Sequence, residues 1–238
     1  MTTVASAGIS VVRDRGVAIL TADDGKANAI GLDWSRQFSE ALDDAAREGD
    51  AVVLAGRPGY FSAGFDMAVM LSGSAAVLEL ISGGQGTLIK VLTHPRPVVA
   101  ACTGHAVAAG AATLLACDAR IGLAGPYKIG FHDVAVGLPL PTLVTTLAHD
   151  RLDPRAFVRA TLGAAVYDPA EAVEVGFLDR VVTEDVVGVA VEEARRLASY
   201  PAEAFRLTKQ WARRDLADRM RAAQQHDIRV MGELLATR

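Results

Sequence analysis

Two segments rich in small residues could bring backbone N–H groups close to a bound ligand: 56–66 (GRPGYFSAGFD) and 103–118 (TGHAVAAGAATLLACD). Small side chains let a ligand approach the backbone. The second segment opens a predicted helix, and first-turn amides lack intrahelical partners and favour negative charge. One amide from Ala63 and one from Ala109 are therefore predicted to hold a carbonyl oxygen that becomes an enolate, each contributing about 3 kcal/mol. Taken alone, the first segment also fits a glycine-rich turn with Asp66 capping a helix.

Other chemistries find less support in the residues. Ser62 lacks a GxSxG elbow and the ordered His and Asp partners of a serine hydrolase. Cys102 and Cys117 sit in alanine-rich apolar surroundings, which favours reduced, buried thiols over a disulfide or a nucleophile. No His, Cys and carboxylate set has metal-ligand spacing, so we expect no metal.

Composition limits the class of protein and its partners. The 238 residues are 51% hydrophobic, enough for one good-sized core, and the formal charge is −4 with basic residues spread along the chain. This argues against a nucleic-acid partner. The apolar stretch Pro97–Cys117 is interrupted by Thr103, Gly104 and His105, and residues 1–8 do not resemble a signal peptide. We therefore expect a soluble cytoplasmic protein with no membrane partner.

The elements that must position the two segments follow from hydrophobic periodicity. Alternating strands and helices argue for an α/β core, followed by a mainly helical region after Asp153. Strands are predicted at 9–13, 17–20, 51–55, 97–101, 119–123 and 178–182, and helices at 32–47, 74–93, 108–116, 184–199 and 202–235. The interleaved charges of the last helix favour a solvated face.

Four ordered motifs together resemble the enoyl-CoA hydratase/isomerase, or crotonase, superfamily. They are NAI, GYFSAGFD, RPVVAACTGHAVAAGAATLLACDARI and GFHDVAVGLPLP, and the resemblance covers about residues 9–182. It implies a crotonase/ClpP-like α/β spiral of β-β-α units over residues 1–182, with a C-terminal helical trimerisation region over 183–238. It also implies a homotrimer or a dimer of trimers acting on an acyl-CoA thioester, with coenzyme A carried by the substrate and no further cofactor.

The resemblance also assigns the site. Ala63 and Ala109 match the two oxyanion donors; the family usually has glycine at the second, and alanine keeps the amide. Asp66 resembles a structural aspartate of the motif. Because coenzyme A is anionic, Lys26, Arg57 and Lys209 are candidate contacts to its phosphates, although each also fits a solvated cation. The residues expected to contact substrate or coenzyme A are Lys26, Ala27, Ala29, Arg57, Ala63, Gly64, Asp66, Met67 and Gly110.

The chain departs from the family at its acids. Hydratases of the family use two glutamates, which would fall on Ala112 and Asp133 here, so one carboxylate is missing. Hydration needs one group for the water and another for the α-carbon, whereas a single base can move a proton between carbons. We therefore expect double-bond isomerisation with Asp133 as base, helped by a raised pKa in an apolar pocket. His132 is a second titratable candidate, although neighbours in an extended segment point in opposite directions.

Two other functions stay open at this stage. An enoyl-CoA hydratase of the fatty-acid β-oxidation type would need water activated by Asp133 or His132 alone. A non-catalytic acyl-CoA-binding protein would keep the oxyanion hole without the acids; Ala112 favours this function and Asp133 opposes it.

Overall fold

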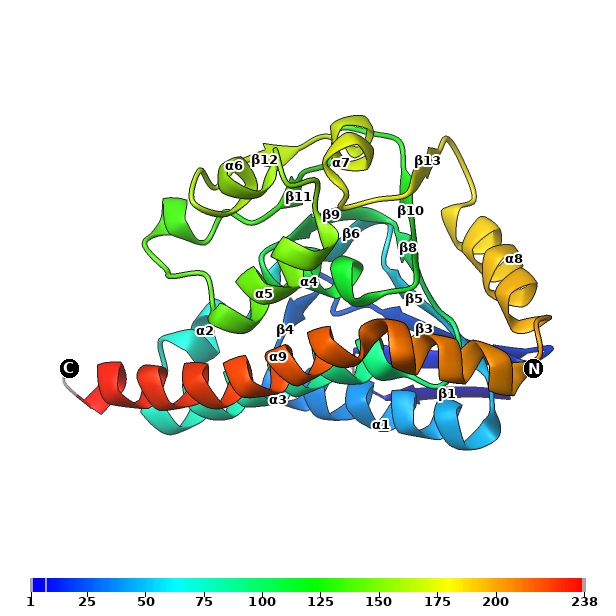
Figure 1. The fold of residues 1–238 in the computed structure, drawn as a ribbon, viewed down its shortest axis with the longest axis horizontal. Coiled ribbons are helices and arrows are strands. Elements are labelled where there is room, and N and C mark those ends of the chain that lie inside the picture. The colour runs from blue at the N-terminus through cyan, green and yellow to red at the C-terminus, as the bar shows by residue number, and fades with distance from the viewer. Residues whose placement is uncertain (1, 7, 237–238) are drawn as a thin grey trace.

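A seven-stranded sheet, in the order β1-β2-β3-β5-β8-β10-β13, runs through the computed structural model, which describes residues 2–6 and 8–236 (Figure 1). The strands β1, β2 and β3 form an antiparallel meander, and the pairs from β3 onward are parallel. Their bounds are Thr2–Ser6 (β1), Ile9–Asp14 (β2), Val17–Ala22 (β3), Ala51–Gly56 (β5), Val98–Cys102 (β8), Ala119–Leu123 (β10) and Arg180–Val182 (β13). All but β1 were predicted from the sequence.

The central strand β5 is buried on both faces, as expected for the continuous apolar run of a parallel strand. Val52 and Leu54 face one hydrophobic cluster, which contains α1, α3 and α4. Val53 and Ala55 face a second cluster, which is closed by α8. The period-two alternation of side chains thus gives the sheet two covered faces.

Two smaller sheets carry the segments singled out in the sequence. One has the order β12-β11-β9-β6 and the other pairs β4 with β7. These strands are Ala29–Ile30 (β4), Gly59–Ser62 (β6), Gly64–Phe65 (β7), Gly104–Val107 (β9), Ile129–Gly130 (β11) and Val166–Tyr167 (β12). None of the six was predicted, because two to four residues are too short to show a strand period.

The five helices predicted from periodicity are confirmed within two residues at each end. The described helices are Leu32–Glu48 (α1), Met67–Met70 (α2), Ser74–Thr93 (α3), Ala109–Ala116 (α4), Thr142–Arg151 (α5), Phe157–Thr161 (α6), Pro169–Val175 (α7), Val186–Ala198 (α8), Ala202–Ala236 (α9) and the 3₁₀ turn Val134–Val136 (η1). Helix α1 ends at Gly49, whose φ of 74° suits glycine in a left-handed cap.

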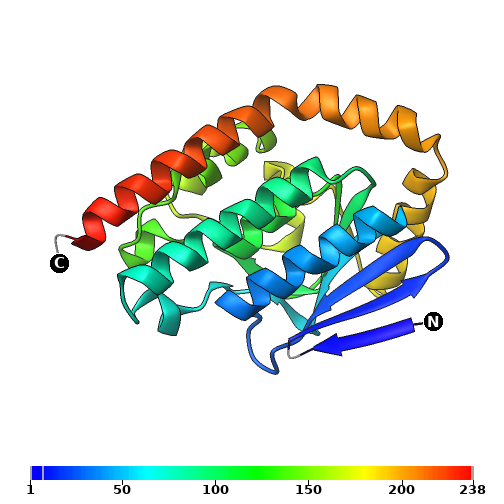
Figure 2. The same ribbon diagram turned by 90° about the horizontal axis from the view of Figure 1, so that it is seen from below.

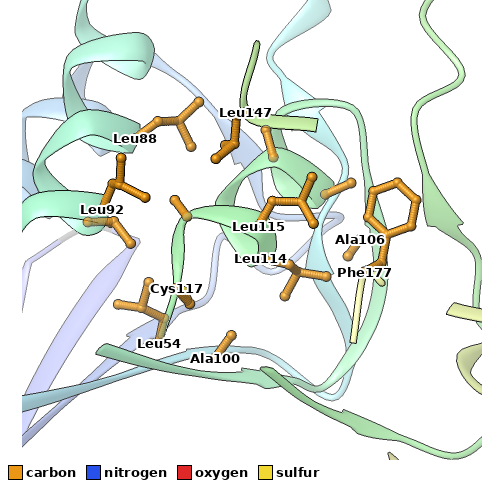
Figure 3. Close-up of a cluster of buried hydrophobic side chains, with 14 of the residues drawn as sticks. Leu54, Leu88, Leu92, Ala100, Ala106, Leu114, Leu115, Cys117, Leu147 and Phe177 are labelled. Carbon is orange, nitrogen blue, oxygen red and sulfur yellow. The ribbon is translucent and has the colours of Figure 1, made fainter. Parts of the chain in front are cut away.

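Helix α4 lies at the centre of the larger cluster. Leu114 and Leu115 are fully buried there, between Leu88 and Leu92 of α3, Leu147 of α5 and the strands of the main sheet (Figure 3). The N-terminus of α4, which the sequence places in the oxyanion hole, is therefore the start of a helix held on all sides by close packing. Cys102 and Cys117 are free and buried, as predicted, and burial raises the pKa of each thiol to about 12.

Helix α9 runs alongside α3 and across α5 as one continuous element of 35 residues (Figures 1 and 2). Asp227 of α9 accepts hydrogen bonds from the backbone N–H groups of Thr142 and Leu143 and from Gln85 Nε2, each at 2.9 Å. The C-terminal helix is thereby attached to the start of α5 and to α3. A carboxylate at the first turn of α5 also suits the helix dipole.

Within the described residues, the stretch Ala75–Thr93 of α3 is long and apolar enough to span a membrane by length and composition, with a mean hydropathy of 1.3. Of this window, 56% is buried inside the protein. It packs against α1 and α9. The core helix of a globular domain has this character.

Candidate active site

The two small-residue segments lie in direct contact. A β-carbon at Gly64 would sit 2.9 Å from Cβ of Ala108 and 3.4 Å from the amide nitrogen of Ala109. Gly64 also has φ of +88°, which favours glycine. Gly110, on the other side, packs so closely on Ser62 that a β-carbon would overlap its carbonyl oxygen. Glycine at both positions lets the start of α4 approach β7.

The structure contradicts Ala63 as an amide donor to a ligand. Its N–H donates to the carbonyl oxygen of Ala27 at 3.0 Å. This bond joins the segment before β7 to the loop before β4, so the amide is already satisfied within the protein. The segment does approach the start of α4 closely, as predicted, but the prediction of Ala63 as its amide donor is wrong.

The backbone N–H of Phe65, two residues after Ala63, lies on the edge of strand β7 that faces away from β4. Asp66 N–H donates to Ile30 C=O at 3.0 Å, and Phe65 lies opposite Ile30 in the β4–β7 pair. Successive residues of a strand direct their backbone groups to opposite edges. The N–H of Phe65 therefore points away from β4. A two-residue strand leaves no sequence pattern from which this direction could be read.

Ala109, the second predicted donor, begins α4, and its φ is not among the positive values of the described residues. Alanine therefore fits that position without distortion. The unusual backbone belongs to its neighbour Ala108, with φ 51° and ψ −121°, a conformation that usually requires glycine. The Ala108 N–H donates to Gly130 C=O at 3.0 Å, and its own C=O accepts from Ala112 N–H at 3.1 Å.

The loop at residues 23–30 is held by Asn28, which is 1% exposed with φ of 54°. Its Nδ2 donates to the carbonyl oxygens of Ala22 and Tyr60 at 2.9 and 3.0 Å. Asp24 accepts from the amides of Lys26 and Asn28 at 2.7 and 2.9 Å. Burial alone would raise the pKa of Asp24, but these backbone hydrogen bonds together lower it. Neither Asn28 nor Asp24 was predicted from the sequence to hold this loop in place.

Asp133 follows β11 by three residues, and β11 pairs with β9, which leads into α4. Its Oδ2 is buried and has no hydrogen-bond partner within the described residues. Burial raises the pKa of this carboxyl, while its own backbone N–H and the nearby His132 pull the pKa down. Nδ1 of the neighbouring His132 is also buried and has no hydrogen-bond partner in the described part of the chain. Two adjacent titratable groups thus present unsatisfied polar atoms close to the start of α4.

Ala112, which stands where the hydratases of the family have a glutamate, is part of the hydrophobic core. Ala112 is 0% exposed and belongs to the larger hydrophobic cluster. Next to it, Phe65 and Ala109 line one small apolar cavity of about 20 Å³. The other lining residues are Ile30, Trp34, Gly84, Thr87, Leu88, Val91 and Thr113.

The three candidate phosphate contacts differ in their exposure and in their ion pairs. Lys26 is exposed at the edge of the loop. Arg57 donates to Lys26 C=O at 2.6 Å and lies 3.3 Å from Asp23, so part of its charge is neutralised. Lys209 is wrong as a phosphate contact: it is buried in the protein, with its Nζ 2.7 Å from Asp118. Burial lowers the pKa of Lys209 to about 8, although Asp118 acts against that shift.

The remaining predicted contacts lie around β7. Ala27 and Ala29 are half-buried, and Ala29 pairs with Gly64 in the β4–β7 ladder. Asp66 caps α2, accepting from the Ala68 N–H at 2.8 Å, the structural role expected for it. Met67, in the first turn of α2, is 52% exposed. Its exposed side chain stays available to a ligand.

Comparison with known proteins identifies the family. The family model described as Enoyl-CoA hydratase/isomerase matches residues 13–238, so the chain belongs to this family of acyl-CoA enzymes. A solved enoyl-CoA hydratase/isomerase family protein from Pseudomonas syringae is 40% identical, with a TM-score of 0.91, over 94% of this chain and 97% of that one. The mixed α/β fold and its C-terminal helical region match those of crotonase-family structures.

Relatives with different named reactions match equally well. Mitochondrial enoyl-CoA delta isomerase 1 of Homo sapiens is 27% identical over 90% of this chain and 72% of its own length. A putative enoyl-CoA hydratase of Thermus thermophilus is 29% identical over 85% of this chain and 82% of its own length. The family acts on acyl-CoA thioesters, and the choice of reaction depends on the residues of this site.

Proposed function

We propose that this enzyme isomerises the double bond of an enoyl-CoA thioester, with Asp133 as its single base. The observation that carries the proposal is the combination of a carboxylate at 133, whose Oδ2 is buried and unpartnered within the described residues, with a fully buried alanine at 112. One carboxylate suffices to remove and return a proton, whereas hydration by two acids needs both.

The amides of Phe65 and Ala109 would form the oxyanion hole in this proposal. Asp133 removes a proton from the α-carbon of a 3-enoyl thioester, and the electron pair passes into a dienolate whose oxygen accepts from the two N–H groups. The same proton then returns to the γ-carbon, so nothing is gained or lost. Each backbone donor is worth about 3 kcal/mol toward the charged state.

Hydration is the second candidate, because His132, beside Asp133, also has a buried nitrogen with no partner among the described residues. In that reaction His132 or Asp133 would activate water, and the other would protonate the α-carbon. The buried Ala112 counts against it, since the family position for a second carboxylate is empty of acid.

Product analysis separates these reactions. The purified enzyme would be incubated with 3-hexenoyl-CoA and with 2-hexenoyl-CoA, alongside Asp133→Asn and His132→Gln. Isomerisation that falls about 10³-fold in Asp133→Asn and survives His132→Gln supports the single-base mechanism. Rapid formation of a 3-hydroxyacyl-CoA that persists in Asp133→Asn would rule it out. Tight thioester binding with no turnover would instead indicate an acyl-CoA-binding protein.

The proposal also covers the contacts to coenzyme A, the oligomeric state and the cellular location. Lys26 and Arg57 are the cations proposed to meet the phosphates of coenzyme A, because Lys26 lies in the loop at residues 23–30 and Arg57 donates to its carbonyl oxygen. A homotrimer is proposed from the family resemblance, and a cytoplasmic location from the free, buried thiols of Cys102 and Cys117. Mass measurement in solution would test the trimer; a strict monomer would contradict it.

A further inference from the structure

Helix α3 contains three glycines, at 83, 84 and 86, in a helix interior where each costs about 1 kcal/mol relative to alanine. Their surroundings differ. A β-carbon at Gly83 would lie 3.7 Å from Ser35 Cβ, and one at Gly86 would lie 3.6 Å from Gln224 Nε2, both ordinary contact distances. Neither glycine is required by space.

Gly84 is different, because the ring of Phe65 lies directly on the helix backbone there. A β-carbon at Gly84 would be 2.5 Å from Cε1 and 2.6 Å from Cζ of that ring. The ring is partly buried and lines, with Trp34 and Ala109, a cavity of about 20 Å³. An added methyl group would therefore displace the ring rather than fit beside it.

We propose that Gly84 is a positioning residue for the reaction: its missing side chain seats the Phe65 ring on α3 and so holds the Phe65 amide opposite Ala109. The proposal rests on the proposed function, in which that amide is an oxyanion donor. The strand β7 has only two residues and one short partner, β4, so the backbone itself holds Phe65 weakly. The packing of the Phe65 ring against α3 therefore holds the Phe65 backbone in place.

The test is a double-mutant cycle between Gly84→Ala and Phe65→Ala, with Gly83→Ala as the matched control. With 3-hexenoyl-CoA, Gly84→Ala is expected to lower kcat about 10-fold with little change in KM, because the donor acts mainly in the transition state. Gly83→Ala is expected to leave kcat unchanged. In the Phe65→Ala background, which keeps the amide but removes the ring, Gly84→Ala should change kcat less than about twofold.

Equal kcat values for Gly84→Ala and Gly83→Ala would overturn the proposal. So would a Gly84→Ala effect of the same size with and without the ring, since that would indicate general damage to α3. Circular dichroism of each variant would verify folding.

A readout without turnover keeps this inference separate from the proposed function. Trp34 lines the same cavity, whereas the other tryptophan, Trp211, is 69% exposed and can be replaced by phenylalanine in every variant. Gly84→Ala should shift the Trp34 emission maximum, and Gly83→Ala should not. If the wild-type protein shows no isomerisation, the proposed function fails, while an unshifted Trp34 spectrum in Gly84→Ala refutes the seating of the ring.

Discussion

The Gly130 carbonyl oxygen accepts a hydrogen bond from the Ala108 N–H at 3.0 Å. This bond joins the strand that precedes Asp133 to the residue that precedes Ala109, the first residue of α4. Since three residues span at most about 11 Å, the proposed base is held near the proposed oxyanion donor by backbone structure alone. The spacing of the two groups is therefore insensitive to most surface substitutions.

The pH dependence of turnover should follow Asp133. Burial raises the pKa of its carboxyl above the usual value of 3.8, and only the ionised form can accept a proton from carbon. We expect kcat/KM for isomerisation to rise with pH above 3.8, through that raised pKa, and then to level off. A profile of kcat/KM against pH measures this. A flat profile above pH 3.8 would show that another group limits the reaction.

The backbone at Ala108 should store strain that glycine releases. At φ of 51° an L-residue is disfavoured, so Ala108→Gly is expected to raise the free energy of unfolding by about 1 kcal/mol. Ala109→Gly, one residue later in helical geometry, should bring no gain. Urea unfolding of the two variants gives the comparison. A less stable Ala108→Gly protein would mean that the alanine methyl packs more favourably than its backbone angle costs.

Asn28 should contribute strongly to the stability of the loop at residues 23–30. Asn28→Ala removes the Nδ2 donor from the carbonyl oxygens of Ala22 and Tyr60, and the Tyr60 oxygen keeps Thr103 Oγ1 at 3.3 Å, so we expect a loss of about 1–3 kcal/mol in unfolding free energy. Lys26→Ala, at an exposed position of the same loop, should change stability by less than about 0.5 kcal/mol. Denaturant midpoints measure both. Equal midpoints would show that the loop is held by other contacts.

Because of Lys209, the free energy of unfolding should vary with pH in the alkaline range. Its folded pKa, about 8, is below the ordinary value of 10.5, so between these values the unfolded chain binds more protons than the folded one. The stability of the wild-type protein relative to Lys209→Met should therefore increase as the pH rises from about 8 to 10.5. Urea unfolding of both proteins across that range tests the sign. A difference that shrinks over this interval would mean that Asp118 keeps the lysine charged.

Much of the fold could be predicted from sequence because its long elements have clear periods. Helix α3 was predicted at its observed bounds, and the buried runs of β5 and β8 were predicted within one residue at each end. The short strands, the helix α5 and the N-terminal strand β1 could not be found in the same way. Their residues are ordered by contacts with distant parts of the chain rather than by local propensity.

The sequence by itself determined the family, the small-residue segments that must approach each other, and the missing acid at Ala112. These depend on residue type and order, which the chain carries directly. Only the tertiary structure decided that the Ala63 amide is already bonded to Ala27, that Phe65 faces the other edge, and that Lys209 is buried against Asp118. The physical reason is that a hydrogen bond or an ion pair between distant residues depends on distance and direction in space, and neither quantity is encoded by local pattern.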